Sequence, residues 1–381
     1  MTQPGAVRSE TAHGDVLDTL LGIEPGSALA QLRAQRPEAT GHMQGTYDAL
    51  FAETPSTSVT RPERFATALA VAALHHEPAL IEHYREQLRA VPGDHESFIA
   101  DVLHGAAETP LHRRLRAIRD HAELLVVRPA AATRADLGKL SAAGFSDAEI
   151  VTVSQLIAFV SFQVRVFVAL ALLRGDERSA PASEIGPKDA TPSGFTQEQV
   201  GWAPWIEPFA AEDASEEQRA VLPGQRLSSP YFRLLALDPP VLGERTATDL
   251  GIFYTHGGLP RADRELSATV TSRVNGCIYC ASVHSRHASQ LSGRPQDVQR
   301  LLDEGIGAAL DDRWRALTDL AAALTVTPPA ATQAHLARLR ALGLADLELL
   351  DAMQAAAFFA WANRLMLTLG EPVLADVEKR N

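Results

Sequence analysis

Cysteine is scarce in this sequence, which has only two in 381 residues. A secreted domain held together by disulfides needs several cysteine pairs, so the sequence predicts a fold that depends on a hydrophobic core. An apolar leader is also lacking, because residues 1–14 contain no hydrophobic run, and we expect this segment to be disordered. These two absences favour a cytoplasmic protein.

An excess of basic residues is absent too. The formal net charge is -12, whereas binding to nucleic acid phosphates requires a basic face, so we expect no nucleic-acid partner. One apolar run, residues 150–173, is long enough to raise the question of a membrane span. Arg165 interrupts this run, and an arginine at the middle of a bilayer is costly. We therefore expect a buried core helix and no membrane partner.

The hydrophobic pattern is helical, and neither β-hairpin signals nor sustained period-two alternation occurs. Leu336, Leu339 and Leu342 recur at helical spacing before Gly343, which favours a helix end. We therefore predict an all-α fold.

The sequence also contains an internal repeat. Arg114–Arg165 aligns with Arg313–Arg364 without a gap, and 22 of the 52 positions are identical. The chain length alone favours two domains. We therefore predict two tandem helical units, residues 15–174 and 195–381, each with six or seven helices. A linker rich in Ser, Pro and Gly, residues 175–194, joins them.

The two cysteines form a Cys-x-x-Cys motif in the second unit, Cys277 and Cys280. His284 follows four residues after the second cysteine, so a helix places all three side chains on one face. Glu265 precedes the first cysteine by twelve residues. A dithiol with a neighbouring base and a carboxylate within reach indicates redox chemistry.

The backbone around the motif supports a reactive thiol. Asn275-Gly276 favours a break between two helices, because both residues tolerate left-handed backbone. Cys277 and Cys280 then lie at the start of a new helix, where the dipole favours a thiolate. From this arrangement we assign Cys280 as the attacking thiol and Cys277 as the resolving thiol. His284 is then the proton acceptor and Glu265 the proton relay.

Other roles for a Cys-x-x-Cys motif fit less well. A c-type haem site needs a histidine directly after the second cysteine, where this chain has Ala281. A zinc site made of the two cysteines with His284 and His287 would stretch over roughly 15 Å of one helix. A thioredoxin-like site lacks its βαβ context, and a disulfide within one helical turn closes too small a loop to stabilise much. Two inert buried cysteines remain an alternative.

The pattern Glu-(x11)-Cys-x-x-Cys-x-x-x-His resembles the AhpD-like alkylhydroperoxidase branch of the carboxymuconolactone decarboxylase superfamily. All four positions match, and the resemblance is clearest over residues 240–370. It implies an all-helical homo-oligomer, such as a trimer or hexamer, that reduces organic hydroperoxides without a metal or other cofactor. The second cysteine is peroxidatic in such a scheme, and an external dithiol, such as a lipoyl-bearing protein, restores the thiols. Tyr279 stands where some members have a histidine.

The first unit departs from the family pattern, because its matching region, residues 61–88, has no cysteine. Phe65 or Ala66 stands at the position of the glutamate, and His83 roughly matches the motif histidine. Decarboxylases of the superfamily work without the cysteine pair, so a histidine-based lactone decarboxylase using His75, His76 and His83 is the second hypothesis. We favour a structural first unit. A third hypothesis is a non-enzymatic, redox-responsive helical oligomer.

A few other residues are weaker candidates. His287 lies on the cysteine face of its helix, and Tyr254 and His256 just precede the helix of the glutamate. Arg165 and Arg364 match each other in the repeat, and we expect each to pair with a carboxylate or a helix end at an interface.

Overall fold

The structure of the protein is a computed structural model that describes residues 14–53, 57–104, 113–179 and 194–374. The predicted all-α class is confirmed. The disorder expected for residues 1–14 concerns a segment that, apart from Gly14, lies outside the described residues, as does most of the predicted linker 175–194. The predicted boundaries of the two units stay a prediction.

Eighteen α-helices make up the described part of the chain. The first nine are α1 (Val16–Leu21), α2 (Ala28–Arg33), α3 (Pro37–Leu50), α4 (Arg61–Leu74), α5 (Pro78–Ala90), α6 (Glu96–His104), α7 (Arg113–Val127), α8 (Arg134–Ala142) and α9 (Asp147–Arg174). The second nine are α10 (Glu216–Val221), α11 (Pro230–Leu235), α12 (Pro239–Phe253), α13 (Arg261–Asn275), α14 (Ile278–Ser292), α15 (Pro295–Glu304), α16 (Asp312–Thr325), α17 (Gln333–Ala341) and α18 (Asp346–Thr368). The expectation of six or seven helices per unit was therefore too low, because short helices of six residues precede the repeated part of each.

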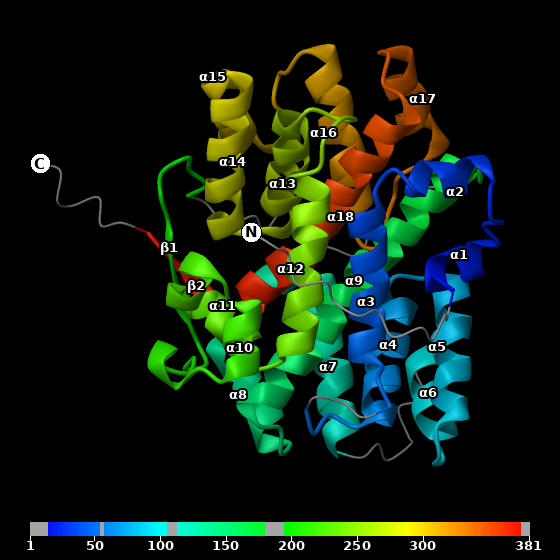
Figure 1. Cartoon of the computed structure of the whole chain (residues 1–381), viewed down its shortest axis with the longest axis vertical. Helices are drawn as coiled ribbons and strands as arrows, with labels where there is room; N and C mark the ends of the chain where they lie inside the picture. Colours follow the sequence, from blue (N-terminus) through cyan, green and yellow to red (C-terminus); the bar gives the residue numbers. More distant parts are fainter. Residues whose placement is uncertain (1–13, 54–56, 105–112, 180–193, 375–381) are drawn as a thin grey trace, which may run out of the picture.

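The helices occur in the same order in the two halves of the chain. Each of α13 to α18 begins 199 or 200 residues after its counterpart among α4 to α9, and α12 begins 202 residues after α3. In Figure 1, α4 to α8 lie at the bottom of the molecule and α13 to α17 at the top, with α3 beside α12 between them. The helix order therefore extends the sequence repeat beyond the aligned segment.

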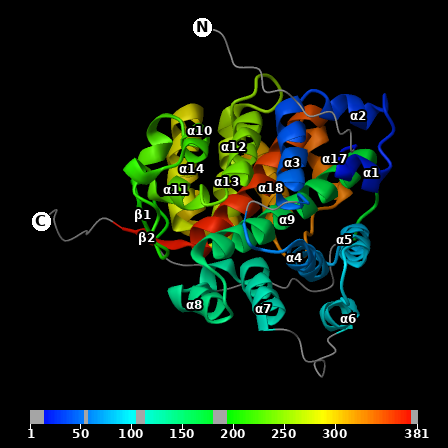
Figure 2. The same ribbon diagram turned by 60° about the horizontal axis from the view of Figure 1, so that its bottom comes forward.

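The two longest helices, α9 and α18, lie side by side through the middle of the molecule (Figure 2). The largest hydrophobic cluster draws on both halves, from Leu17 to Leu369, so the two halves share a core. By length and composition α9 is apolar enough to cross a membrane, but 94% of its apolar window is buried inside the protein. That burial is typical of a core helix, as expected for residues 150–173.

Two buried arginines link the halves at this helix pair. Arg165 of α9 donates to the backbone carbonyls of Thr325 and Val326 at the end of α16, and Arg364 of α18 donates to the carbonyl of Val126 near the end of α7. The prediction that these arginines meet a helix end is confirmed. The C-terminal end of a helix carries partial negative charge, so each guanidinium stabilises unpaired carbonyls across the shared core.

Asp351 of α18 is a second link, and we predict that its removal destabilises the fold strongly. Its buried carboxylate accepts from Arg36 at 2.6 and 2.8 Å and from Arg264 at 2.9 Å. The change Asp351→Ala leaves two buried cations without their anion, which should lower the free energy of unfolding by about 3–5 kcal/mol. Urea unfolding measures this loss.

The control for this change is Asp346→Ala, which removes the exposed pair with Arg340 and should cost no more than about 1 kcal/mol. Equal losses in the two variants would contradict the role assigned to Asp351.

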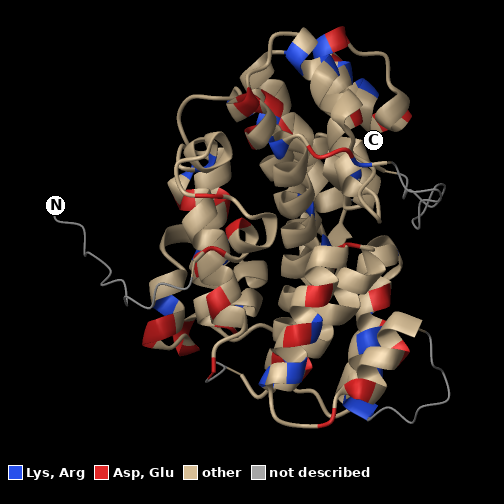
Figure 3. Cartoon of the chain, turned by 90° about the vertical axis from the view of Figure 1, so that its right-hand side faces the viewer, with Lys and Arg blue, Asp and Glu red and all other residues tan. Residues whose placement is uncertain are grey.

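Extended structure is limited to one antiparallel ribbon in the described segments, which pairs β1 (Gly201–Pro204) with β2 (Gly370–Val373). The sequence reading missed it, because strands of four residues are too short for period-two alternation to show. Trp202 of β1 donates to the Met366 carbonyl and contacts Tyr231 of α11, so the ribbon ties α11 to the end of α18. Acidic and basic residues are interspersed along the ribbon seen in Figure 3.

Candidate functional site

The two cysteines lie at the turn between α13 and α14, as the sequence predicted. Asn275 ends α13, and Gly276 adopts left-handed backbone, with φ of 78°. Cys277 is the N-cap residue of α14, which begins at Ile278. A side chain at Gly276 would be strained in this conformation, so glycine suits the sharp return of the chain. Cys280 consequently lies in the first turn of α14, close to its unpaired amide groups.

The return of the chain brings Glu265 of α13 against His284 of α14. The Glu265 carboxylate contacts Nδ1 of His284 at 2.6 Å and also accepts from Arg261 at 3.1 Å. Glu265 is only 1% exposed, and Phe359 of α18 packs edge-on against the imidazole, with ring centroids 4.1 Å apart. The pair is therefore an oriented carboxylate–imidazole unit, in which the carboxylate is buried and the imidazole is partly exposed. The remaining nitrogen of the imidazole, Nε2, is available for proton transfer.

The two free thiols are buried and have opposite electrostatic environments. Burial raises the pKa of Cys277 well above its ordinary value, and the neighbouring sulfur of Cys280 adds to this effect. Burial also acts to raise the pKa of Cys280, but the Cys277 thiol, then His284, Asn363 and Arg245, outweigh it, so the pKa of Cys280 is lowered. The negative charge of the pair is thus favoured on Cys280.

Asn363 of α18 closes the site on the other side of the thiols. Its side-chain amide acts to lower the pKa of both cysteines. The amide oxygen accepts from Asn275 at 3.0 Å, and the amide nitrogen donates to Ser272 at 3.0 Å. Because its partners fix its orientation, the amide is a preorganised donor for a sulfur anion.

Three polar residues near the thiols were missed by the sequence reading: Asn363 on α18, and Arg245 and Asp249 on α12. Arg245 is 4% exposed and lowers the pKa of Cys280, whereas burial raises the pKa of Asp249, which also faces His284. No motif marks these residues, since they lie far from the cysteines in sequence. A comparison of α12 with α3 would have singled out Arg245, because Met43 occupies the matching position.

The weaker candidate residues differ in whether they contact the groups of this site. His287 contacts His284 edge-on, with ring centroids 6.1 Å apart, and Tyr279 packs between two hydrophobic clusters. Tyr254 is exposed and stacks on the guanidinium of Arg261. His256 is exposed, and the described contacts join only its backbone carbonyl to another residue, Arg36. The geometry therefore gives His287 a place beside the imidazole and gives His256 none.

In the first half, none of the four positions that match the thiol site keeps its residue type. Since α5 and α14 begin 200 residues apart, Tyr84 matches His284, and the approximate match with His83 was one residue out of register. Of the two residues predicted for the glutamate position, Phe65 and Ala66, the helix register selects Phe65, which stacks on Phe51 with ring centroids 4.7 Å apart. At the positions of Cys277 and Cys280 the chain has, in that order, Glu77 and Leu80.

The three candidate histidines of the first half have different surroundings. His75 is buried and lies 3.3 Å from the Ser161 hydroxyl, and His83 lies 2.8 Å from the Tyr47 hydroxyl, where burial lowers its pKa to about 4. His76 adopts left-handed backbone at the end of α4. Over the described residues, no group of three or more His, Cys, Asp or Glu side chains is arranged to hold a metal ion. These positions fit the structural role that we favoured for the first unit.

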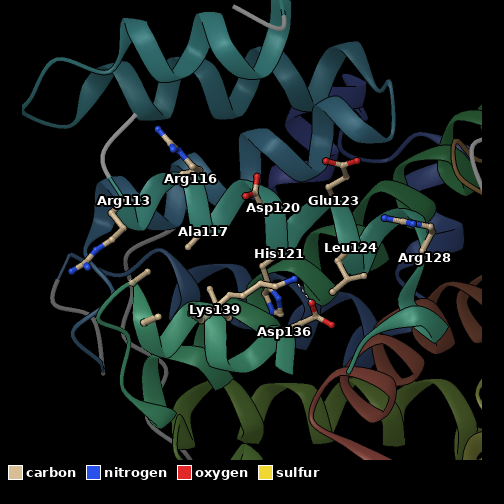
Figure 4. A pocket seen from close by; sticks show the side chains of 13 residues that line it. Arg113, Arg116, Ala117, Asp120, His121, Glu123, Leu124, Arg128, Asp136 and Lys139 are labelled. Atoms are coloured by element: carbon tan, nitrogen blue, oxygen red, sulfur yellow. Dashed lines mark hydrogen bonds and ion pairs between the residues drawn. The ribbon is translucent and has the colours of Figure 1, made fainter. Parts of the chain in front are cut away.

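A separate cavity of about 520 Å³ lies between α7 and α8 of the first half (Figure 4). Lys139 and Asp136 form an ion pair at 2.7 Å on its wall, and the buried His121 lies 3.1 Å from the Ser154 hydroxyl. Burial lowers the pKa of His121 to about 4, so this imidazole is neutral at physiological pH. The lining holds no thiol, and the hydrogen bond of its imidazole goes to a hydroxyl, so this cavity lacks the dithiol of the site at α14.

Comparison with known proteins gives one family for this part of the chain. Residues 239–323 match the sequence model of the carboxymuconolactone decarboxylase family. This segment spans α12 to α16 and contains the glutamate, both cysteines and the histidine of the site. The comparison with curated proteins gave no match.

Proposed function

Because residues 239–323 belong to the carboxymuconolactone decarboxylase family, whose helical fold this chain has, we propose that the protein reduces organic hydroperoxides through its dithiol. The observation that carries the proposal is the Glu265–His284 pair, with 2.6 Å between a buried carboxylate and the imidazole, beside two thiols with opposite pKa shifts. A low-pKa thiol next to a resolving thiol is the arrangement that peroxide reduction needs.

The chemistry runs in three balanced steps. The Cys280 thiolate attacks one peroxide oxygen, the O–O bond breaks, and Cys280 becomes a sulfenic acid. The leaving alkoxide takes a proton from the His284 imidazolium, which Glu265 orients, and departs as an alcohol. The Cys277 thiol then attacks the sulfenic acid, which forms the disulfide and releases water. An external dithiol reduces this disulfide and becomes a disulfide itself.

The partners follow from that cycle. We propose that a small dithiol carrier, such as a lipoyl-bearing protein, is the reductant, because a disulfide buried at a helix start requires a slender reductant. A reducing cytoplasm is the compartment in which such a cycle turns over. We further propose a homo-oligomer of the two-unit chain, in which the first unit supplies structure to the second.

Steady-state turnover tests the proposal. Protein is mixed with cumene hydroperoxide and dihydrolipoamide, and peroxide loss is compared between the wild type and a Cys277→Ser/Cys280→Ser double variant. The wild type should turn over, and the double variant should fall to the uncatalysed rate. Equal turnover by both proteins would contradict thiol chemistry.

A histidine-based lactone decarboxylase is the second candidate, and one observation favours it. The oriented carboxylate–imidazole pair is also an acid–base unit of the kind that proton transfer next to a carbonyl requires. Decarboxylation of a carboxymuconolactone by the double cysteine variant at the wild-type rate would support this candidate. A disulfide-dependent change of oligomer size without turnover of either substrate would instead support a redox-responsive assembly.

A further inference from the structure

Arg245 is a buried cation that the proposed chemistry does not yet use. Its side chain lies on α12, is 4% exposed, and makes one hydrogen bond, at 3.4 Å, to the hydroxyl of Tyr231. Its Nε is buried without a hydrogen-bond partner, and the described segments place no carboxylate at ion-pair distance from it. A buried guanidinium without an anion is destabilising, so its presence calls for a charge that it balances.

The surroundings hold this guanidinium in place without neutralising it. Its carbon lies 5.1 Å from the ring centroid of Phe358, 5.7 Å from that of Trp361 and 5.9 Å from that of Tyr231. We call these three rings the aromatic cage. The three rings of the cage belong to the same hydrophobic cluster as Cys277 and Cys280. Ring faces attract a cation but do not cancel its charge, so the field of Arg245 persists in the interior around the thiols.

The first half of the chain supplies an internal comparison. Pro37 opens α3 and Pro239 opens α12, and the last turns match as well, since Arg64 donates to the Leu50 carbonyl and its counterpart Arg264 to that of Ile252. In this register the residue that matches Arg245 is Met43, which is buried. The rings of Phe159 and Phe162 match two members of the cage. The site thus carries a cation where the thiols are present and a methionine of similar length where they are absent.

We propose that Arg245 is the permanent counter-cation of the Cys280 thiolate, which it keeps charged and ready for attack even when His284 is neutral. His284 carries a positive charge only after it takes a proton, and it shares that charge with Glu265 at 2.6 Å. Arginine stays protonated at every physiological pH, so its contribution does not depend on the state of the relay. The inference rests on the proposed function only in its choice of Cys280 as the charged thiol.

Other charged groups also face the thiols, and the test must separate them. Cys277 and His284 act from α14 itself. On α12, Asp249 lies one turn after Arg245 and competes for its charge. Burial raises the pKa of Asp249, which weakens this competition.

Three further titratable or charged groups near the site do not change the charge that acts on Cys280. Tyr231 of α11 is neutral, since burial raises its pKa, and the same holds for Tyr279 of α14. Arg261 of α13 pairs with the glutamate behind the imidazole, so its charge is already balanced.

The test measures how fast Cys280 reacts with iodoacetamide across the pH range, in a Cys277→Ser background so that one thiol reacts. Only the thiolate reacts, so the midpoint of the profile reports its formation. The change Arg245→Met should raise this midpoint by about one pH unit, and slow alkylation below the midpoint about tenfold. Arg245→Lys keeps the charge and should stay within about threefold of the parent rate.

Arg233→Met on α11 is the matched control, because it removes a cation that is not among the main groups that act on Cys280, and it should leave the profile nearly unchanged. Asp249→Asn removes the competing anion, so it should not raise the midpoint. Met43 indicates that a methionine packs at this position, and circular dichroism checks the fold of each variant. If Arg245→Met fails to fold, Arg245→Gln against Arg245→Lys makes the same comparison.

An unchanged midpoint in a folded Arg245→Met or Arg245→Gln protein would overturn the proposal, as would an equal shift in Arg245→Lys. Alkylation requires no peroxide, so this result stands apart from the proposed function. If Arg245 supplies the charge and hydroperoxides are nevertheless not reduced, the inference survives and the proposed function fails.

Discussion

Cys280→Ser is expected to abolish hydroperoxide reduction, with a fall in turnover on the order of a thousandfold or more. The serine hydroxyl cannot form the anion that attacks the O–O bond at neutral pH, because its pKa is far above that of a thiol. The surroundings of Cys280, including Asn363 and the neighbouring Cys277, are built to favour a sulfur anion and have no comparable effect on an alcohol.

Cys277→Ser should behave differently, because it removes only the second step. This variant should still consume one equivalent of hydroperoxide and then stop as a Cys280 sulfenic acid, which dimedone traps for mass spectrometry. It is therefore the matched control for Cys280→Ser, since both changes replace one buried sulfur by oxygen. A Cys280→Ser protein that forms a sulfenic acid on Cys277 would reverse the two assignments.

Glu265→Gln is expected to reduce turnover about a hundredfold without preventing thiolate formation on Cys280. The amide retains the size of the carboxylate but cannot stabilise the imidazolium at 2.6 Å, so His284 delivers its proton to the leaving alkoxide less readily. Arg261 also loses its anion. Steady-state turnover, compared with the exposed control Glu371→Gln on the terminal ribbon, measures the effect.

The free energy of unfolding of Glu265→Gln, measured at several pH values, tests whether Glu265 and His284 form a charged pair. Burial acts to raise the pKa of Glu265, but the bond and charge of His284 outweigh it, so the folded pKa lies below the unfolded value. The ion pair therefore stabilises the fold fully above the unfolded pKa of about 4.3, and this contribution is lost as the pH falls through the lower folded pKa. The variant should be less stable than the wild type at neutral pH, and the gap should close in acid. A constant gap would contradict a charged pair.

The local geometry of the site could be predicted because it depends on a short stretch of sequence. The left-handed Gly276 ends one helix, and the spacing of Cys280 and His284 fixes their common face on the next. A return at this turn leaves Glu265 few places other than beside the imidazole. The all-α fold followed from helical periodicity and from the lack of sustained period-two alternation.

The residues that tune the thiols could not be predicted, because tertiary packing brings them in from other helices. Asn363 comes from α18 and Arg245 from α12, and neither belongs to a local motif. The predicted match between His83 and the motif histidine was out of register for a related reason. Two neighbouring aromatic-type side chains, His83 and Tyr84, follow each other on α5, and only the helix start at Pro78 decides which one matches the motif histidine.

The shared core could not be predicted from the sequence either, because a repeat predicts two similar units but not how they pack against each other. Burial of α9 against α18 and the crossing contacts of Arg165 and Arg364 make the halves interdependent. A unit with Met43, Phe65 and Leu80 at the site positions can therefore be retained for packing alone.

The most direct test of the account is a single-turnover reaction of the fully reduced protein with a stoichiometric organic hydroperoxide. Peroxide loss and free thiols are followed together, and the product is analysed by mass spectrometry. We predict rapid loss of one peroxide and two thiols per chain, with an intramolecular disulfide between Cys277 and Cys280 and release of the corresponding alcohol. Thiols that persist beside unreacted peroxide in the folded protein would contradict it.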